Sequence, residues 1–239
     1  MVHTRKELAM IKKIISTFSE IAFPKVCVCC GNSVVPPNEY ICNYCLRNRF
    51  APHIPDETLI LPEIINFQFA MWQFDKGGYL QNLLHKLKYD YLKGVGEELG
   101  FAAGKAFLKY NEINNFNIGE LTPLIVPVPL HPSKQRKRGY NQARAIGEGI
   151  SKVMGWPVLA SGEVERIKKT TTQTGLSSEA RKKNLFQAFK LNDREIINQH
   201  FPIVVDDVFT TGATTFELAD ELLKENREQR AGILTVAMA

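Results

Sequence analysis

Residues 203–215 read IVVDDVFTTGATT, passing from an apolar run through two carboxylates into a turn of hydroxyls and glycine. The run from Ile203 to Val205 is apolar without alternation, which is typical of a parallel strand buried on both faces. Asp206 and Asp207 follow at its carboxyl end, where open α/β sheets place their ligand crevice. The turn then offers hydroxyls and helix N-terminal N–H groups, which suit a phosphate. A phosphorylated sugar would satisfy both halves of the stretch.

Each part of this stretch also has a simpler interpretation. An acidic pair after a strand is often solvated loop, and Thr-Thr-Gly is often a turn with a helix cap. Other phosphate loops do not fit, because the chain has no Gly-x4-Gly-Lys-[Ser/Thr] sequence. The run GVGEELG at 94–100 misses the dinucleotide fingerprint by one residue and follows no predicted strand. The ordered combination therefore favours a ligand site at residues 206–214.

Composition indicates an ordinary globular protein with one basic portion. The chain has 239 residues, of which 44% are hydrophobic and 23% charged, and a net charge of +5. Residues 131–190 hold 13 Lys and Arg against 4 Asp and Glu, so the remainder is net acidic. This imbalance favours a polyanionic ligand or partner such as pyrophosphate or nucleic acid, although a basic stretch is often only solvated surface.

The first 22 residues predict an amphipathic helix. Apolar side chains recur there at helical spacing and are interrupted by Lys12, Lys13 and Glu20, unlike the continuous core of a signal peptide. We expect the apolar face to pack against the protein itself, with a membrane or a partner as the alternative. The sequence thus predicts a cytoplasmic protein without membrane insertion.

Five cysteines between positions 27 and 45 predict a small metal module over residues 23–50. Cys27 and Cys30 form one Cys-x2-Cys pair and Cys42 and Cys45 a second, which suits a closed structural zinc site of the zinc-ribbon type. Disulfides are the alternative and are disfavoured in a reducing compartment. Cys29 could replace a ligand of the first pair, but its spacing fits less well.

The rest of the chain predicts an α/β domain over residues 66–239, joined to the metal module by a proline-containing linker at 51–65. Strands are expected at 66–74, 124–130, 158–160, 203–205 and 233–238. Helices are expected at 80–89, 97–110, 140–154 and 213–224. This alternation predicts a doubly wound parallel sheet flanked by helices.

Two further segments are candidates for ligand contact. Residues 126–142, VPVPLHPSKQRKRGYNQ, predict a strand ending in prolines and then a basic loop. Lys134, Arg136, Lys137 and Arg138 of this loop could surround a leaving pyrophosphate. The long polar stretch at 166–184 has a central glycine and predicts a lid over the ligand, with a surface loop as the alternative.

The stretch at 203–215 resembles the phosphoribosyl-pyrophosphate (PRPP) motif of type I phosphoribosyltransferases. The resemblance implies that Asp206 and Asp207 contact the ribose hydroxyls. It also implies that the following turn holds the 5′-phosphate through Thr210, Thr211, Gly212, Ala213 and Thr214.

From about Phe23 onward, the chain resembles the ComF family, which has a type I phosphoribosyltransferase fold and a zinc-binding N-terminal part. The resemblance rests on the cysteine pairs, the VPVPLHP and RGYNQ segments, the pattern of the lid and the PRPP motif. Lys134 and Val164 depart from it conservatively, and Lys88-Tyr89 matches a Lys-Tyr pair of the family. The resemblance implies a link to DNA uptake and natural transformation.

Three functional hypotheses follow. The first is an enzyme that transfers the 5-phosphoribosyl group from PRPP with Mg²⁺ to a nitrogen acceptor that the sequence does not identify. Its catalytic residues would be Asp206 and Asp207, with Arg136, Arg138 and Arg181 offsetting the charge of pyrophosphate. The second is a PRPP-responsive protein that binds single-stranded DNA. The third is a non-catalytic adaptor for proteins of the competence machinery.

Overall fold

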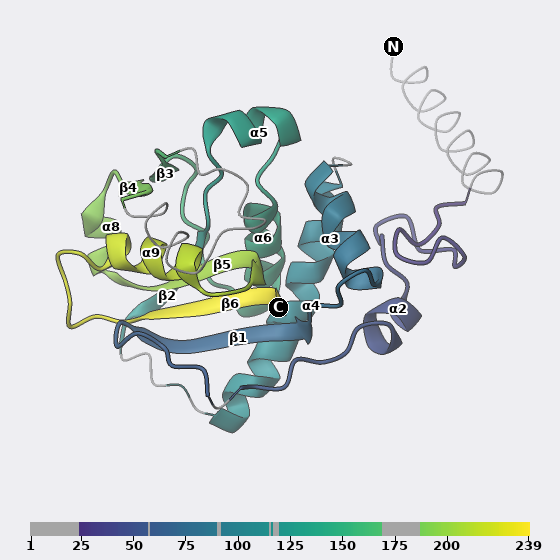
Figure 1. Cartoon of the computed structure of the whole chain (residues 1–239), viewed down its shortest axis with the longest axis horizontal. Helices are drawn as coiled ribbons and strands as arrows, with labels where there is room; N and C mark the ends of the chain where they lie inside the picture. Colours follow the sequence, from purple (N-terminus) through teal and green to yellow (C-terminus); the bar gives the residue numbers. More distant parts are fainter. Residues whose placement is uncertain (1–23, 57, 90–91, 115, 117–119, 169–186) are drawn as a thin grey trace, which may run out of the picture.

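The computed structural model describes residues 24–56, 58–89, 92–114, 116, 120–168 and 187–239. The predicted N-terminal helix, Arg181 and most of the predicted lid lie outside these residues. Figure 1 shows a parallel sheet with helices on both faces. Its strands are, in spatial order, β1 (Ile65–Gln73), β6 (Ala231–Met238), β5 (His200–Phe209) and β2 (Thr122–Pro127). The predicted fold class is confirmed.

The central strand β5 is apolar because it is covered on both sides. Ile203 and Val205 belong to the cluster of buried residues that contains the helices α3 (Tyr79–Tyr89), α4 (Lys93–Asn114) and α6 (Gln142–Met154). Val204 faces the other cluster, which contains α8 (Arg194–Asn198) and α9 (Ala213–Leu222). Side chains alternate between the faces of a strand, so a central strand needs apolar residues at every position.

Helices α4 and α6 pack closely because glycines line their contact. A Cβ atom at Gly100 would lie 2.0 Å from the carbonyl oxygen of Ile146, and one at Gly149 would lie 2.0 Å from that of Glu97. The two backbones therefore touch in a way that larger residues would prevent. The glycines at 94–100, which nearly match a dinucleotide fingerprint, begin helix α4, and Gly96 and Gly100 contact α6.

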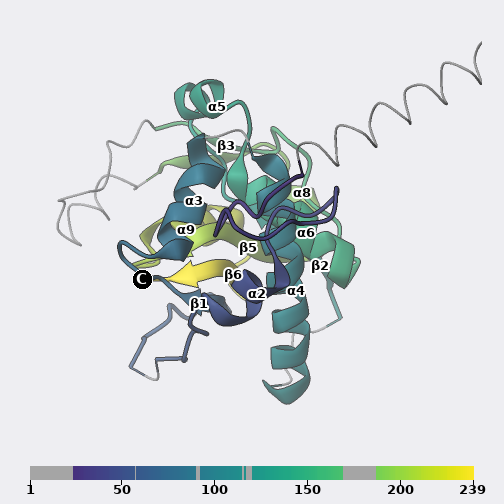
Figure 2. The same cartoon turned by 90° about the vertical axis from the view of Figure 1, so that its right-hand side faces the viewer.

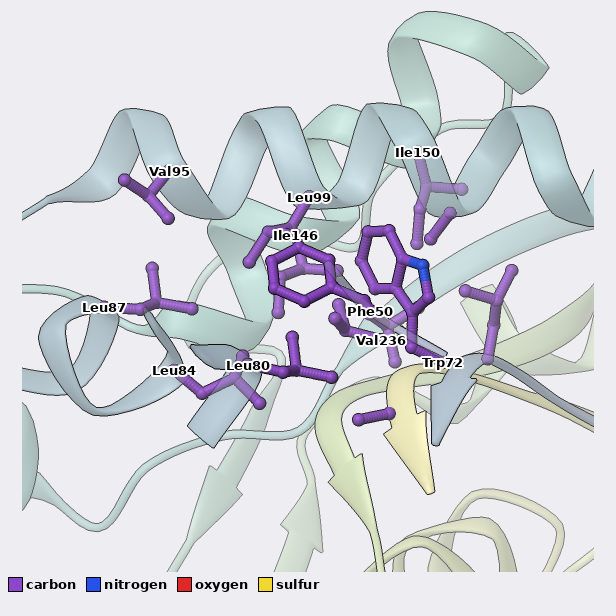
Figure 3. Packing of buried hydrophobic residues seen from close by; sticks show 14 of the residues in the cluster. Phe50, Trp72, Leu80, Leu84, Leu87, Val95, Leu99, Ile146, Ile150 and Val236 are labelled. Atoms are coloured by element: carbon purple, nitrogen blue, oxygen red, sulfur yellow. The ribbon is translucent and has the colours of Figure 1, made fainter. Parts of the chain in front are cut away.

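The cysteine segment packs onto the same core. Helix α2 (Asn43–Asn48) ends just before Phe50, whose ring meets that of Trp72 in β1 edge-on at 5.0 Å between centroids. Figure 3 shows this pair beside Leu80 and Leu84 of α3 and Leu99 of α4. In Figure 2 the segment lies beside α3 and α4. The metal module and the sheet domain thus share one hydrophobic cluster.

The basic segment after β2 is a helix, not the predicted loop. It forms α5 (Pro132–Arg138), which begins with Pro132 in the first turn and His131 as the N-cap, and ends at Gly139 in the left-handed conformation. Proline is favoured in a first turn and glycine after a last one, and Lys, Arg and Gln between them are good helix formers. Figure 1 shows α5 at the top of the molecule.

Two other expectations for the sheet domain need correction. Residues 158–160 do not form a strand, because only Val158 makes a single bridge to Ile125. The predicted lid does not begin at Arg166, since β3 (Val164–Arg166) pairs antiparallel with β4 (Phe189–Leu191). Strands of three residues are too short to show a clear alternation in sequence. Within the described residues, no helix is long and apolar enough to span a bilayer.

Candidate functional site

Strand β5 continues through both carboxylates and ends at Phe209, four residues beyond the apolar run. Asp206 and Asp207 lie near the carboxyl end of the sheet, where Asp206 is opposite Thr235 of β6. Asp207 is buried, whereas Asp206 is half-buried, and the backbone N–H of Asp207 donates to Oδ1 of Asp206 at 2.9 Å. Two carboxylates are thus held together at the edge where parallel sheets bind their ligands.

The last turn of α3 supplies the partner of this acidic pair. Lys88 Nζ forms an ion pair with Oδ2 of Asp207, and the two side chains are 27% and 8% exposed. The position of this turn is fixed by Tyr140, whose hydroxyl donates to the carbonyl oxygen of Leu87. The Lys-Tyr pair noted in the sequence therefore places its lysine against the acidic pair.

The environment drives the two carboxyl pKa values apart. Burial and the neighbouring charge of Asp207 raise the pKa of Asp206 well above its usual range. Burial alone would raise the pKa of Asp207 as well, but the charge of Lys88 prevails and lowers it. Burial would likewise lower the pKa of Lys88, and the two carboxylates reverse that effect. Asp207 is therefore the stable anion of the pair, and Asp206 holds a proton more readily.

Further cations from two other elements surround the pair. Burial and the charges of Arg166, Arg138 and Lys88 lower the pKa of Lys134. Arg166 in β3 is 8% exposed and interacts electrostatically with Asp206. Arg138 in α5 acts electrostatically on Asp207. Cations of this density repel one another, so the arrangement favours a ligand with several negative charges.

The turn after β5 completes this edge of the sheet. Thr210 and Thr211 are exposed, Gly212 has φ of 72° as the residue before α9, and Ala213 and Thr214 form the first turn of that helix. The first N–H groups of a helix have no partner within it, and they attract anions. A side chain at Gly212 would collide with the ring of Phe216, so the turn requires glycine.

The other predicted ligand residues take different positions. Arg138 is half-buried near the acidic pair, whereas Arg136 is exposed on the same helix. Arg181 lies outside the described residues. The sequence did not identify Arg166 as a site residue. Arg166 begins the polar stretch at 166–184, and no apolar alternation there predicts a strand. Its place in the β3–β4 hairpin depends on pairing with residues that follow the predicted lid.

The second candidate site is a cluster of four sulfurs. The ligand atoms of Cys27, Cys30, Cys42 and Cys45 lie within 4.8 Å of one another, and Sγ of Cys27 lies 3.9 Å from that of Cys45. A tetrahedral zinc ion with Zn–S bonds of about 2.3 Å separates its sulfurs by about 3.8 Å. The four thiols could therefore hold a metal ion such as zinc, and Cys29 is not a member of this group.

Local geometry favours the thiolate form of Cys30. The N–H of Gly31 donates to the carbonyl oxygen of Cys27 at 2.8 Å, and Gly31 has the positive φ that this tight turn (the knuckle) requires. Hydrogen bonds from the backbone N–H of Asn32 and Ser33 lower the pKa of Cys30 to about 6. A thiol with that pKa is largely a thiolate at neutral pH, and the thiolate is the form that binds zinc.

Polar contacts attach the metal module to two helices. Lys86 Nζ of α3 donates to the carbonyl oxygen of Val28 at 2.9 Å. Glu98 of α4 accepts from the N–H of Tyr40 at 2.7 Å and from that of Ile41 at 3.2 Å. Because Val28 lies between two sulfur ligands, the first of these contacts reaches the knuckle itself.

Several curated proteins are similar to the chain over part of its length. It is 40% identical over 114 residues to competence protein F of Haemophilus influenzae, which covers 46% of the chain and 48% of that protein. It is 32% identical over 148 residues to DNA utilization protein YhgH of Salmonella typhimurium, covering 61% of each. It is also 29% identical over 113 residues to competence protein ComFC of Bacillus subtilis, covering 47% of the chain and 43% of that protein.

These similarities span about half to three-fifths of the relatives' length. No known family model matches the sequence. The relatives nevertheless agree with one another in the names they carry, since two are competence proteins and one is a DNA utilization protein.

Proposed function

Since these similarities support a ComF family protein, we propose that the chain binds PRPP at the Asp206–Asp207 edge of its sheet and acts in DNA uptake. One observation carries the first part of the proposal. An acidic pair at the carboxyl end of a central strand, with Asp207 buried, lies between a helix N-terminal turn and a group of cations. PRPP has the matching groups, with hydroxyls on its ribose, one phosphate at one end and pyrophosphate at the other.

Each part of the site has a role toward this ligand. Asp207 and Asp206 accept hydrogen bonds from the ribose hydroxyls, and the turn at 210–214 donates N–H groups to the 5′-phosphate. Lys134 and Arg138 of α5 face the pyrophosphate, together with Arg166 of β3. Mg²⁺ carried with the ligand would offset further charge on the pyrophosphate oxygens. These assignments agree with the roles that the resemblance implied for the PRPP motif.

The reaction that this site favours is transfer of the phosphoribosyl group. The bond from the ribose anomeric carbon to pyrophosphate breaks, a bond to an acceptor nitrogen forms, and the acceptor loses a proton. Positive charge develops on the ribose, near the anionic Asp207, and negative charge develops on pyrophosphate, near the cations. The main contribution of the protein is to hold charges of opposite sign at the two ends of the breaking bond.

The test is calorimetric titration of PRPP with Mg²⁺ into the zinc-loaded protein. We expect saturable binding that is lost in the double variant Asp206→Ala/Asp207→Ala and kept in Asp193→Ala, which removes a carboxylate that caps α8 instead. Absence of binding to the unaltered protein would overturn the proposal. If PRPP binds, release of pyrophosphate on addition of candidate nitrogen acceptors decides whether the protein is an enzyme.

Binding of single-stranded DNA is a second candidate function, and the surface of α5 favours it. Arg136 and Lys137 are exposed there, and the half-exposed ring of Tyr89 lies 5.9 Å from Nζ of Lys137 and 5.4 Å from the guanidinium carbon of Arg138. Basic side chains beside an exposed aromatic ring suit phosphates and stacked bases. This surface adjoins the acidic pair, so DNA affinity could respond to PRPP.

Fluorescence anisotropy with a labelled oligonucleotide tests this second function. We expect an affinity that falls steeply as salt rises and weakens in Arg136→Ala/Lys137→Ala, because these residues would neutralise phosphates. The matched control is Lys105→Ala/Lys109→Ala, which removes the same charge from exposed positions on α4. Negligible affinity at low salt, or equal losses in both variants, would leave the adaptor role as the alternative.

A further inference from the structure

The last turn of α3 connects the metal module to the acidic pair through consecutive residues. Lys86 Nζ donates to the carbonyl oxygen of Val28 in the metal knuckle at 2.9 Å. Two positions on, Lys88 forms the ion pair with Asp207. Between them, the carbonyl oxygen of Leu87 accepts from the hydroxyl of Tyr140. A single turn of helix thus contacts both candidate sites.

Helix geometry makes these contacts a rigid connection. Successive residues of an α-helix are rotated by about 100°, so Lys86 and Lys88 extend to nearly opposite sides of α3. The helix is anchored between them by Leu80, Leu83 and Leu87, which are at most 1% exposed. A displacement of the knuckle that pulls on Lys86 therefore moves the backbone that carries Lys88.

We propose that metal binding by the cysteine module and anion binding at the acidic pair are thermodynamically coupled through α3, with Lys86 as the positioning residue. The proposal rests on the proposed function for the identity of the anion, which is PRPP. Lys86 touches neither the metal ligands' sulfurs nor the acidic pair. Its role is to hold the turn of helix from which Lys88 reaches Asp207.

The direction of the coupling follows from what the metal stabilises. Four thiolates around one ion fix the knuckle, and with it the carbonyl oxygen of Val28 that Lys86 contacts. Loss of the metal releases that carbonyl, and the last turn of α3 loses its contact through Lys86. Lys88 is then held less firmly where it meets Asp207 and the incoming anion. Metal therefore strengthens anion binding and, by reciprocity, the anion raises the affinity of the module for metal by the same factor.

The first measurement is the zinc affinity of the protein, determined at equilibrium by competition with a zinc-selective chelator, with and without saturating PRPP. We expect PRPP to raise the zinc affinity by about fivefold, a coupling at the lower end of the usual range. In Lys86→Met this increase should largely disappear while one zinc ion stays bound, since methionine preserves the packing of the aliphatic stem. Lys109→Met is the matched control, since Lys109 is an exposed lysine of α4, and should behave like the unaltered protein.

The second measurement follows the acetylation rate of Lys88 by mass spectrometry and uses no PRPP. We expect slow acetylation in the zinc-loaded protein, and faster acetylation both in Lys86→Met and after zinc removal. Lys86→Met retains zinc, so it stays informative even where the zinc-free protein unfolds.

The two measurements separate the failure of this inference from the failure of the proposed function. Absence of PRPP binding to the unaltered protein overturns the proposed function, and the acetylation rates then decide the coupling alone. Equal acetylation of Lys88 in the unaltered protein and in Lys86→Met overturns the coupling. So does an equal increase of zinc affinity by PRPP in both proteins.

Discussion

The cysteine module and the acidic edge of the sheet are assembled in opposite ways. The module draws its four sulfurs from residues 27–45, and short backbone contacts within that segment bring them together. The acidic edge draws its charged groups from α3, α5, β3 and β5, which are far apart in the sequence. We therefore expect the module to depend on a metal ion for its local order, and the acidic edge to depend on the packed core of the whole domain.

This difference predicts how each site responds to loss of one residue. A metal ion held by the four sulfurs would supply folding energy to the module, so we expect removal of one sulfur to affect the whole segment. Removing one charge from the acidic edge leaves the sheet intact, so the effect should depend on which charge is removed. The following predictions test that contrast, beginning with the largest expected effect.

Replacement of a sulfur ligand should be the most damaging change. We expect Cys45→Ser to abolish zinc binding and to lower the free energy of unfolding by at least about 3 kcal/mol, because the metal's binding energy is lost. Zinc content and urea unfolding measure both effects. Cys29→Ser is the matched control and should keep a full zinc equivalent, since Cys29 is not among the four clustered sulfurs. Equal zinc loss in the two variants would show that Cys29 is a ligand.

The two carboxylates of the acidic edge should differ in their effect on stability. Asp207→Asn leaves Lys88 without its ion-pair partner, and we expect a loss of about 2 kcal/mol at pH 7. Asp206→Asn should be neutral or stabilising, because the raised pKa of Asp206 means that folding disfavours its ionised form. Urea unfolding of both variants tests this asymmetry, and equal destabilisation would contradict it.

The same asymmetry gives the acidic edge a defined dependence on pH. The lowered pKa of Asp207 contributes stability above the pKa of the unfolded chain, and this contribution is lost as pH falls. The raised pKa of Asp206 acts with the opposite sign, so its contribution is lost as pH rises.

Substitution of the glycine in the turn after β5 should destabilise the protein less than loss of the ion pair. It should destabilise the protein more than substitution of a glycine that has open space around it. In Gly212→Ala the new Cβ would lie 2.3 Å from the ring of Phe216, at φ of 72°. We expect a loss of about 1.5 kcal/mol, together with weaker PRPP binding. Gly155→Ala provides the control, because Gly155 has φ of 70° but nothing within 4 Å of a Cβ. A smaller loss of stability in Gly155→Ala would separate the cost of the positive φ from that of the collision with Phe216. Equal losses in the two variants would show that Phe216 moves aside.

The contrast between local and distant assembly also explains what the sequence could predict. The spacing of the cysteines identified all four clustered sulfurs, because the site is encoded within one short segment. The apolar run at 203–205 identified the central parallel strand, since a strand that is buried on both faces is apolar at successive positions. Patterns that depend on neighbours in the chain were therefore predictable.

Features that depend on distant contacts were predicted less well. The ion pair of Lys88 with Asp207 and the approach of Arg166 to Asp206 arise from tertiary packing, which no periodicity records. Helix α5 is a different case, because Pro132 and Gly139 are ordinary signals for the start and end of a helix. The sequence nevertheless predicts a loop there, because the seven residues bury no side chain and thus carry no apolar pattern.

The smallest expected effect tests whether the acidic pair acts as a pair toward its ligand. Asp206 accepts a hydrogen bond from a ribose hydroxyl more strongly when it is ionised, and its raised pKa shifts that ionisation to higher pH. We therefore expect PRPP affinity to rise as pH rises through the raised pKa of Asp206, by about threefold from this group, an effect of less than 1 kcal/mol. Phosphate ionisation of PRPP and the titration of Lys134, whose pKa is lowered, also change the affinity with pH. Both of these effects persist in Asp206→Asn. The contribution of Asp206 is therefore the difference between the calorimetric pH profiles of the unaltered protein and of this variant. Parallel profiles would mean that Asp207 alone contacts the ribose.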